Sequence, residues 1–318
     1  MTKALTIIST FLFLNFSCMQ PCKVEDSVKD QARTTLSTIL HKHSVWIKVH
    51  AAEYLLWLNQ DISEVQKTYL EEYEQFQNEP KYRIGISRVL YQTETDTAKK
   101  QVWLDKVLAV FGDTTSPDRI HAAETLAKLK TSPETRYPEA TLASLNDTSR
   151  ILQTYTLWAT SYTSPEAAAT NKLEFIRRAF EDPDTIIRKI SAYILMKSRD
   201  LTGEEWDLFA SRALKEPRDN DWRNNLLQTA LVTYTGGDDA RFRQIKSEIC
   251  EGWSGFSASQ RIELAQALAE KGDCSDVKIL SAFLNDQETN GHYDPETPVA
   301  ADLRAAAAFA LLKIAERN

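Results

Sequence analysis

The sequence is poor in the residues that tight turns need. Only 9 of its 318 residues are glycine and 10 are proline. Folds built from many strands and hairpins use both residue types at their turns, so this composition disfavours a β-rich protein. Alanine, leucine, glutamate, lysine and glutamine are plentiful instead, and these residues favour helices. The composition therefore predicts an all-α protein.

The chain also lacks a basic tract. Its net charge is −7, and its lysines and arginines are scattered, with short pairs such as Lys99-Lys100 and Arg177-Arg178. Proteins that bind nucleic acid need basic surface to contact phosphates. We therefore expect no nucleic-acid partner.

Motifs that announce catalysis or metal binding are missing as well. The sequence holds four cysteines but no CxxC motif and no histidine pair at zinc-ligand spacing. It has no Gly-rich phosphate loop and no GxSxG motif. We expect no metal, no cofactor and no catalytic residue. Cys250 and Cys274 are the one pair suited to a disulfide within the fold, and two free buried thiols are the preferred interpretation.

The N-terminus carries an apolar run of 13 residues, from Ala4 to Phe16, after Lys3. This run is too short to span a bilayer as a helix and is typical of a signal peptide. No other segment is apolar enough to cross a membrane.

The end of this run resembles a bacterial lipoprotein signal, because the small Ser17 directly precedes Cys18. In that family the cysteine is acylated and becomes the mature N-terminus. The usual leucine three residues before the cysteine is replaced here by Asn15. The resemblance implies a signal peptide over residues 1–17, a tether over residues 18–26, and a membrane anchor facing the periplasm or the cell surface. Plain secretion and an uncleaved anchor are the alternatives.

From Ser27 onward the sequence predicts eight helix pairs. An apolar stripe marks the second helix of each pair and recurs about every 36 residues, the signature of an α-solenoid. The stripes begin at Val49, Ile86, Ile120, Ile151, Ile190, Leu226, Ile262 and Leu303. The first helices are expected near residues 27–42, 62–77, 95–111, 137–145, 165–180, 202–215, 238–250 and 275–285.

Four second helices carry a more specific resemblance. They read WIKVHAAEYL from Trp46, PDRIHAAETL from Pro117, PDTIIRKISAYIL from Pro183 and DLRAAAAFALLKI from Asp302. These segments resemble HEAT repeats of the short bacterial type, whose second helix reads Arg-x-x-Ala-Ala-x-x-Leu after a turn. The resemblance implies an all-α superhelix (a solenoid) of about eight HEAT-like pairs, forming a single domain over residues 27–318.

Two histidine–glutamate pairs look like the beginnings of a chemical site. His50 and Glu53 stand three residues apart, as do His121 and Glu124, so each pair shares one helix face. The pairs fall in the first and third repeats, and the second repeat offers Ser87 and Leu90 instead. At about 10 Å per helix layer the two pairs cannot share a metal ion. We interpret them as polar surface positions, with contact to a partner as the alternative.

Aromatic residues mark another candidate surface. Tyr54 and Trp57 occupy the same places in the first repeat as Tyr155 and Trp158 do in the fourth. Second helices line the concave side of HEAT-type solenoids, so these rings could contact a sugar or a peptide. Filling the core between the layers is the competing interpretation.

The longest insertion, residues 286–298, holds His292 and Tyr293. Insertions into a solenoid often fall on its binding face, which makes these two residues candidates for contact with a partner. The competing interpretation is a tolerated flexible loop.

Two classes of function remain. The preferred one is a non-catalytic, membrane-tethered scaffold of the cell envelope that binds a protein or a glycan over an extended surface. A regulatory or sensor partner of a transporter has the same sequence features as such a scaffold. The alternative is an enzyme, or an enzyme subunit, of envelope polysaccharide metabolism, because helical repeats can close into a ring with a catalytic cleft. A closed ring that brings histidine, tyrosine and carboxylates into one pocket would overturn the preference for a scaffold.

Overall fold

The computed structural model describes residues 23–220, 222–237, 239–286 and 299–317. Over these ranges the chain forms sixteen α-helices, two short 3-10 turns and no strand. The expected signal peptide, Cys18, His292 and Tyr293 lie outside the described residues. None of the helices in the described ranges is long and apolar enough to cross a membrane.

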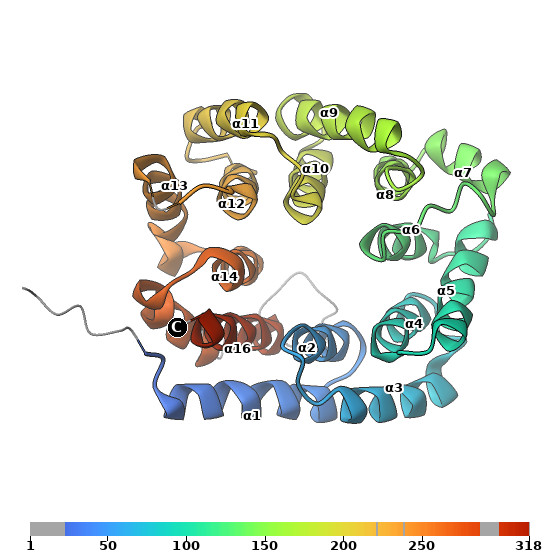
Figure 1. Ribbon diagram of the computed structural model, residues 1–318, viewed down its shortest axis with the longest axis horizontal. Helices are drawn as coiled ribbons and strands as arrows, with labels where there is room; N and C mark the ends of the chain where they lie inside the picture. Colours follow the sequence, from blue (N-terminus) through green and yellow to red (C-terminus); the bar gives the residue numbers. More distant parts are fainter. Residues whose placement is uncertain (1–22, 221, 238, 287–298, 318) are drawn as a thin grey trace, which may run out of the picture.

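The helices alternate between an outer and an inner layer (Figure 1). The outer helices are α1 (Asp26–Lys42), α3 (Ile62–Phe76), α5 (Thr97–Gly112), α7 (Pro138–Leu145), α9 (Pro165–Glu181), α11 (Gly203–Lys215), α13 (Ala240–Cys250) and α15 (Val277–Leu284). The inner helices are α2 (Val45–Trp57), α4 (Tyr82–Thr93), α6 (Arg119–Lys128), α8 (Arg150–Thr160), α10 (Thr185–Ser198), α12 (Arg223–Thr233), α14 (Ala258–Lys271) and α16 (Val299–Arg317). All eight expected pairs are present, and the predicted all-α superhelix is confirmed.

Side-chain caps set the start of several helices. Thr202 and Ser257 each accept the backbone N–H of the residue three positions on, and the side chains of Glu205 and Gln260 bond back to the cap. These capping boxes satisfy backbone amides that have no partner within the first turn. Single caps of the same kind begin α5, α8, α9, α10 and α13, from Asp96, Ser149, Ser164, Asp184 and Asp239.

Small residues allow the inner helices to pack closely. Ala52, Ala123, Ala265 and Ala306, which recur at one place in the repeat, are completely buried. Each inner helix packs on the inner helices before and after it, and every inner helix except α14 also packs closely on the outer helix that precedes it. Outer helix α13 packs on α12 instead. A single pair could not bury its apolar stripe in this way, so the core is continuous through the array.

The superhelix closes on itself. Helix α16 packs against α1 and α2 as well as against its sequence neighbours α14 and α15 (Figure 1). His50 Nδ1 in α2 lies 2.9 Å from Asp302 Oδ1 in α16, and Gln31 Nε2 in α1 donates to Asn285 Oδ1 at 2.9 Å. The first helix pair therefore continues the stack after the last, and the molecule is a ring rather than an open solenoid.

The two cysteines of the folded body differ. Cys250 is a free thiol, whereas Cys274 is disulfide-bonded, so the two are not bonded to each other. The expectation of free thiols is therefore correct for Cys250 and wrong for Cys274. Burial and the nearby Asp276 carboxylate raise the pKa of the Cys250 thiol to about 12. A thiol with so high a pKa is a poor nucleophile at neutral pH.

Candidate functional site

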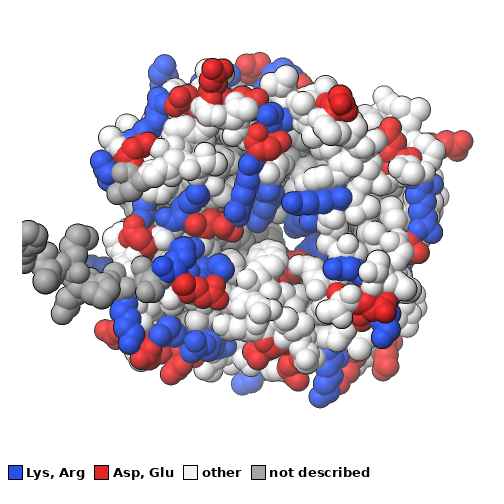
Figure 2. All heavy atoms as spheres, viewed as in Figure 1, with Lys and Arg blue, Asp and Glu red and all other residues white. Residues whose placement is uncertain are grey.

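The inner helices enclose a cavity of 490 Å³ at the centre of the ring. Its lining comes from α2, α4, α6, α8, α10, α14 and α16, and from the turns after α6 and α8. Figure 2 shows a hollow at the centre of the face that is seen end-on in Figure 1, with Lys and Arg side chains around it. We call this space the central cavity.

Most of the residues singled out in the sequence meet in the central cavity. Of the ten, seven line it: His50, Glu53, Tyr54, Trp57, Glu124, Tyr155 and Trp158. His121 does not line it, and its ring lies against Trp46 with centroids 5.2 Å apart. His292 and Tyr293 lie outside the described residues. The fold thus unites the histidine–glutamate and the aromatic candidates in one place.

Glu53 is not the surface residue that the sequence predicted. It is 5% exposed, and its carboxylate accepts hydrogen bonds from Arg88 Nε at 2.7 Å and from the Arg88 terminal nitrogen at 3.0 Å. Burial alone would raise the pKa of this carboxyl, but Arg88 outweighs burial and holds the pKa at about 2. The second repeat therefore presents Arg88 here rather than Ser87 or Leu90. Periodicity predicted the helix but not which side chain of α4 faces α2.

Two further carboxylates of the cavity are also paired. Glu124 lies 2.8 Å from Lys128, one turn along α6, and the charges of Lys128 and Arg88 lower its pKa against the effect of burial. Asp302 pairs with His50 across the closing contact of the ring. Burial alone would lower the pKa of His50, but the charge and hydrogen bond of Asp302 raise it. These pairs fix the side chains in place.

The aromatic residues divide between packing and lining. Tyr54 is 2% exposed, stacks on Phe309 with centroids 4.7 Å apart, and accepts a hydrogen bond from Gln266 Nε2 at 2.9 Å. Trp158 is equally buried and packs edge-on against Tyr193. Trp57, by contrast, is 46% exposed. The core interpretation is therefore correct for Tyr54 and Trp158. The Trp57 ring is open to solvent, and its contact with a ligand stays a prediction.

The sequence did not reveal Lys197 of α10. Its ammonium lies 5.6 Å from the centre of the Trp57 ring and 5.5 Å from that of Tyr193. The Lys197 side chain is exposed to solvent in the cavity. Desolvation by the groups around the ammonium, together with the Lys128 charge, lowers its pKa to about 8. In the sequence Lys197 is simply a basic residue in the last turn of a helix, a common complement to the helix dipole. No local pattern distinguishes it.

Glu263 of α14 was missed for a similar reason. Its carboxylate accepts a hydrogen bond from Asn225 Nδ2 at 3.0 Å. Burial raises its pKa, an effect that the Asn225 hydrogen bond and the Lys189 charge only partly offset. Glutamates on helices are usually solvated, so only the closed ring shows that this one faces a cavity.

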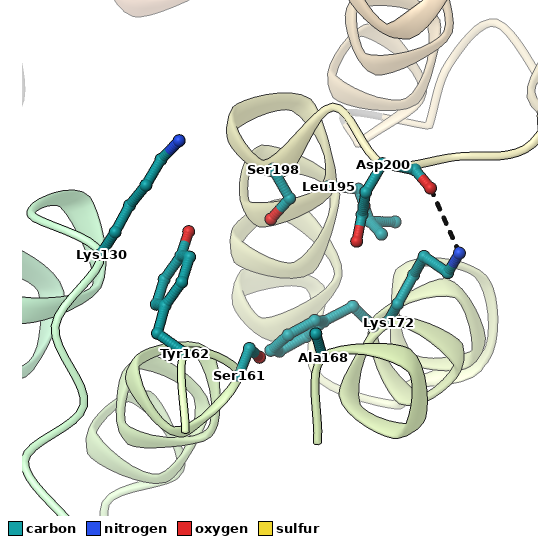
Figure 3. A pocket seen from close by; sticks show the side chains of 9 residues that line it. Lys130, Ser161, Tyr162, Ala168, Lys172, Leu195, Ser198 and Asp200 are labelled. Carbon is teal, nitrogen blue, oxygen red and sulfur yellow. Dashed lines mark hydrogen bonds between the residues drawn. The ribbon is translucent and has the colours of Figure 1, made fainter. Parts of the chain in front are cut away.

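A smaller cavity of 180 Å³ adjoins the central one and shares Lys130 and Tyr162 with it (Figure 3). Lys172, on its far side, donates to the Asp200 carbonyl oxygen at 3.2 Å and to Glu205 Oε2 at 2.8 Å. Lys172 is thus already bonded. Because the smaller cavity also shares residues with the central one, we treat it as an extension of the central cavity rather than a separate site.

No cluster of three or more His, Cys, Asp or Glu side chains suited to a metal ion occurs in the part of the chain that the structure describes. No family model, curated protein or solved structure matches this chain. We therefore infer function from the geometry and chemistry of the central cavity.

Proposed function

We propose that this protein binds a small glycan, or the end of a longer one, in the central cavity of its helical ring. The convergence of seven inner helices on one cavity of 490 Å³ carries the proposal. Small-molecule sites commonly measure about 300–1,000 Å³. A cavity of this size admits a few sugar rings and excludes a folded protein.

The lining suits a ligand with apolar faces and hydroxyl edges, which is the chemistry of a sugar ring. Trp57 and Tyr193 offer aromatic faces, while Gln92, Gln266 and Tyr155 offer polar groups. Gln92 Nε2 donates to Glu53 Oε1 at 2.9 Å, and Gln92 Oε1 accepts from Trp57 Nε1 at 3.2 Å, so these groups are held in place before a ligand arrives. Such preorganisation reduces the conformational entropy lost on binding.

The sequence led us to expect a protein or a glycan bound over an extended surface. We now propose that the ligand is a glycan and that it binds in the central cavity. We also propose that the repeats are of the short bacterial HEAT type, and that the protein is exported and anchored to the cell envelope through a lipid on Cys18. The four repeat segments and the Ser17-Cys18 ending support these points. The disulfide bond of Cys274 adds support, because disulfides persist in oxidising compartments.

An enzyme of polysaccharide metabolism is the second candidate. Glu263, with a raised pKa, and Lys197, with a lowered one, line the same cavity. Titratable groups shifted in this way gather at catalytic sites. The closed ring and its pocket of histidine, tyrosine and carboxylates meet the criterion that would overturn the preference for a scaffold. We keep catalysis as the second candidate because three of these carboxylates, Glu53, Glu124 and Asp302, are already paired with Arg88, Lys128 and His50.

Calorimetric titration of the purified full chain with a panel of envelope oligosaccharides tests the proposal. We expect at least one glycan to bind, and Trp57→Ala to weaken its binding about tenfold or more, as loss of a central aromatic anchor does. Trp103→Ala, which removes an indole from outer helix α5, is the matched control and should bind like the wild type.

The absence of binding to every glycan, or equal affinity of the wild type and Trp57→Ala, would refute a glycan site at Trp57. Chromatography of the glycan after incubation separates the two candidates. A shortened or unsaturated product that accumulates with time would favour the enzyme.

A further inference from the structure

We infer that Lys197 forms an anion-binding subsite in the central cavity, so that the glycan it receives carries a carboxylate or phosphate group. This inference rests on the proposed function and names the class of ligand. Three observations carry it: the position of the Lys197 ammonium, the state of the comparable basic residues, and the charge balance of the cavity.

The Lys197 ammonium lies close to two aromatic side chains, which come from different helices of the helical ring. One is Trp57 at the end of α2, and the other is Tyr193, one turn earlier in α10. Among the described residues, no carboxylate lies within ion-pair distance of it, and no protein acceptor takes a hydrogen bond from it. An ammonium has three donors, and the described residues occupy none of them.

The other basic residues in the last turns of inner helices show that this state is unusual. Helix dipoles favour basic residues at these positions equally. Lys128 in α6 pairs with Glu124 at 2.8 Å. Lys271 in α14 donates to the Tyr234 carbonyl oxygen at 2.6 Å, and Arg317 in α16 donates to the carbonyl oxygens of Ala269 and Gly272 at 2.6 and 2.8 Å. Lys197 alone of these four has aromatic faces in place of an acceptor.

The charges around the cavity leave a positive excess beside Lys197. Arg88, Lys128 and His50 pair with Glu53, Glu124 and Asp302, in that order. Burial raises the pKa of the remaining carboxyl group, Glu263, and so favours its neutral form. Lys130, which is exposed and lines the same cavity, adds a further positive charge. An anion would therefore meet a cation without displacing an existing partner.

The environment of Lys197 also favours an incoming anion energetically. Desolvation by the surrounding groups and the Lys128 charge both disfavour its protonated form, although the side chain is open to solvent. Glu270 and Glu53 only partly compensate, and Arg199 adds repulsion. A ligand carboxylate would supply a close counter-charge and stabilise the ammonium. The two flanking rings would at the same time contact the apolar face of the sugar that bears it.

Titration calorimetry with matched ligands tests the inference. The probes are disaccharides that end in glucuronate or galacturonate, their neutral glucose and galactose counterparts, and inorganic phosphate. We expect the wild type to bind the acidic members about 10- to 100-fold tighter than the neutral ones, the range for a hydrogen bond to a charged group. Lys197→Met should abolish this difference, whereas Lys271→Met, which removes the lysine in the last turn of α14, should retain it.

A chemical measurement on the unaltered chain supports the titration and covers the case in which Lys197→Met fails to fold. Acetic anhydride labels unprotonated amines, and mass spectrometry measures the labelling of each lysine. A uronate probe should protect Lys197 at least about tenfold, as an ion-paired ammonium is withdrawn from reaction, while the exposed Lys278 should label at an unchanged rate. Protection by inorganic phosphate as well would indicate an anion site that accepts either group.

The possible failures are distinct. Equal affinity for acidic and neutral sugars, with no protection of Lys197, would refute the anion subsite and leave the glycan site intact. The absence of binding to acidic and neutral sugars alike would refute the proposed function, and this inference with it.

Discussion

The contact that closes the ring differs from the contacts between consecutive helix pairs. Between α2 and α4, the charged pair of Glu53 and Arg88 is almost completely buried, with both side chains at most 7% exposed. Between α2 and α16, the His50 side chain is 32% exposed, although its partner Asp302 is only 5% exposed. The bond between Gln31 of α1 and Asn285, at the end of α15, lies at the surface. The consecutive contact thus contains a buried charge pair, whereas the polar contacts of the closing one are partly solvated.

At the closing contact, apolar packing takes the place of a fully buried charge pair. Helix α16 buries a continuous set of alanines, Ala305 to Ala308, together with Leu303 and Phe309, and Phe309 stacks on Tyr54. Burial of apolar surface is favourable but non-directional. We infer that alanine packing provides the energy of closure and that His50 with Asp302 sets the register, while charge recognition specifies how α4 lies on α2.

The largest effect is expected from breaking the contact between α2 and α4. Arg88→Met leaves the Glu53 carboxylate buried without its partner, which should lower the free energy of unfolding by about 3–5 kcal/mol. Urea denaturation followed by circular dichroism measures the loss. The double variant Arg88→Met with Glu53→Leu should recover most of it, because an apolar pair needs no counter-charge. A loss below about 1 kcal/mol would mean that this contact is solvated like the closing one.

Overpacking compares the two contacts at equivalent positions. Ala306→Leu in α16 and Ala123→Leu in α6 each introduce a large side chain at a completely buried site. Each should lower the free energy of unfolding by about 1–3 kcal/mol. Chemical denaturation of both variants measures the difference between them. A normal loss for Ala123→Leu with none for Ala306→Leu would show that the packing around α16 is looser than the packing around α6.

The closing ion pair should give a pH-dependent effect. The pKa of His50 is raised in the folded protein, so its pair with Asp302 stabilises the fold below pH 6.5 and loses this contribution as pH rises through the folded pKa. His50→Gln should therefore lower the free energy of unfolding by about 1–2 kcal/mol near pH 6 and by less near pH 9. Denaturation curves at both values, for variant and wild type, measure this. An effect that grows with pH would contradict the pairing.

The smallest effect should come from the surface bond of the closing contact. Gln31→Ala removes an exposed hydrogen bond, and surface substitutions of this kind change the free energy of unfolding by about 0.5 kcal/mol or less. Thermal and urea denaturation should show almost no change. A loss of stability as large as that of His50→Gln would mean that Gln31 of α1, rather than His50 of α2, sets how the first and last helix pairs align where the ring closes.

The helices could be predicted closely because their signals are local. Each apolar stripe and each capping pair lies within one segment, so the bounds of α1, α9 and α11 differ by at most one residue from those expected. The site was predicted only in part. Seven lining residues stood out because they belong to unusual helical patterns, such as the tyrosine and tryptophan three residues apart. Arg88, Tyr193, Lys197 and Glu263 had no such pattern and depend on contacts between helices far apart in the chain.

The sequence by itself determined that this protein is a stack of eight helix pairs, since composition and a period of about 36 residues leave few other ways to bury the stripes. The tertiary structure decided that the stack closes. Closure depends on the small rotation between successive pairs, which accumulates over the whole array and appears in no single repeat. The same rotation brings Trp57 of α2 to Lys197 of α10, so the site that the aromatic residues suggested exists only because the ring is complete.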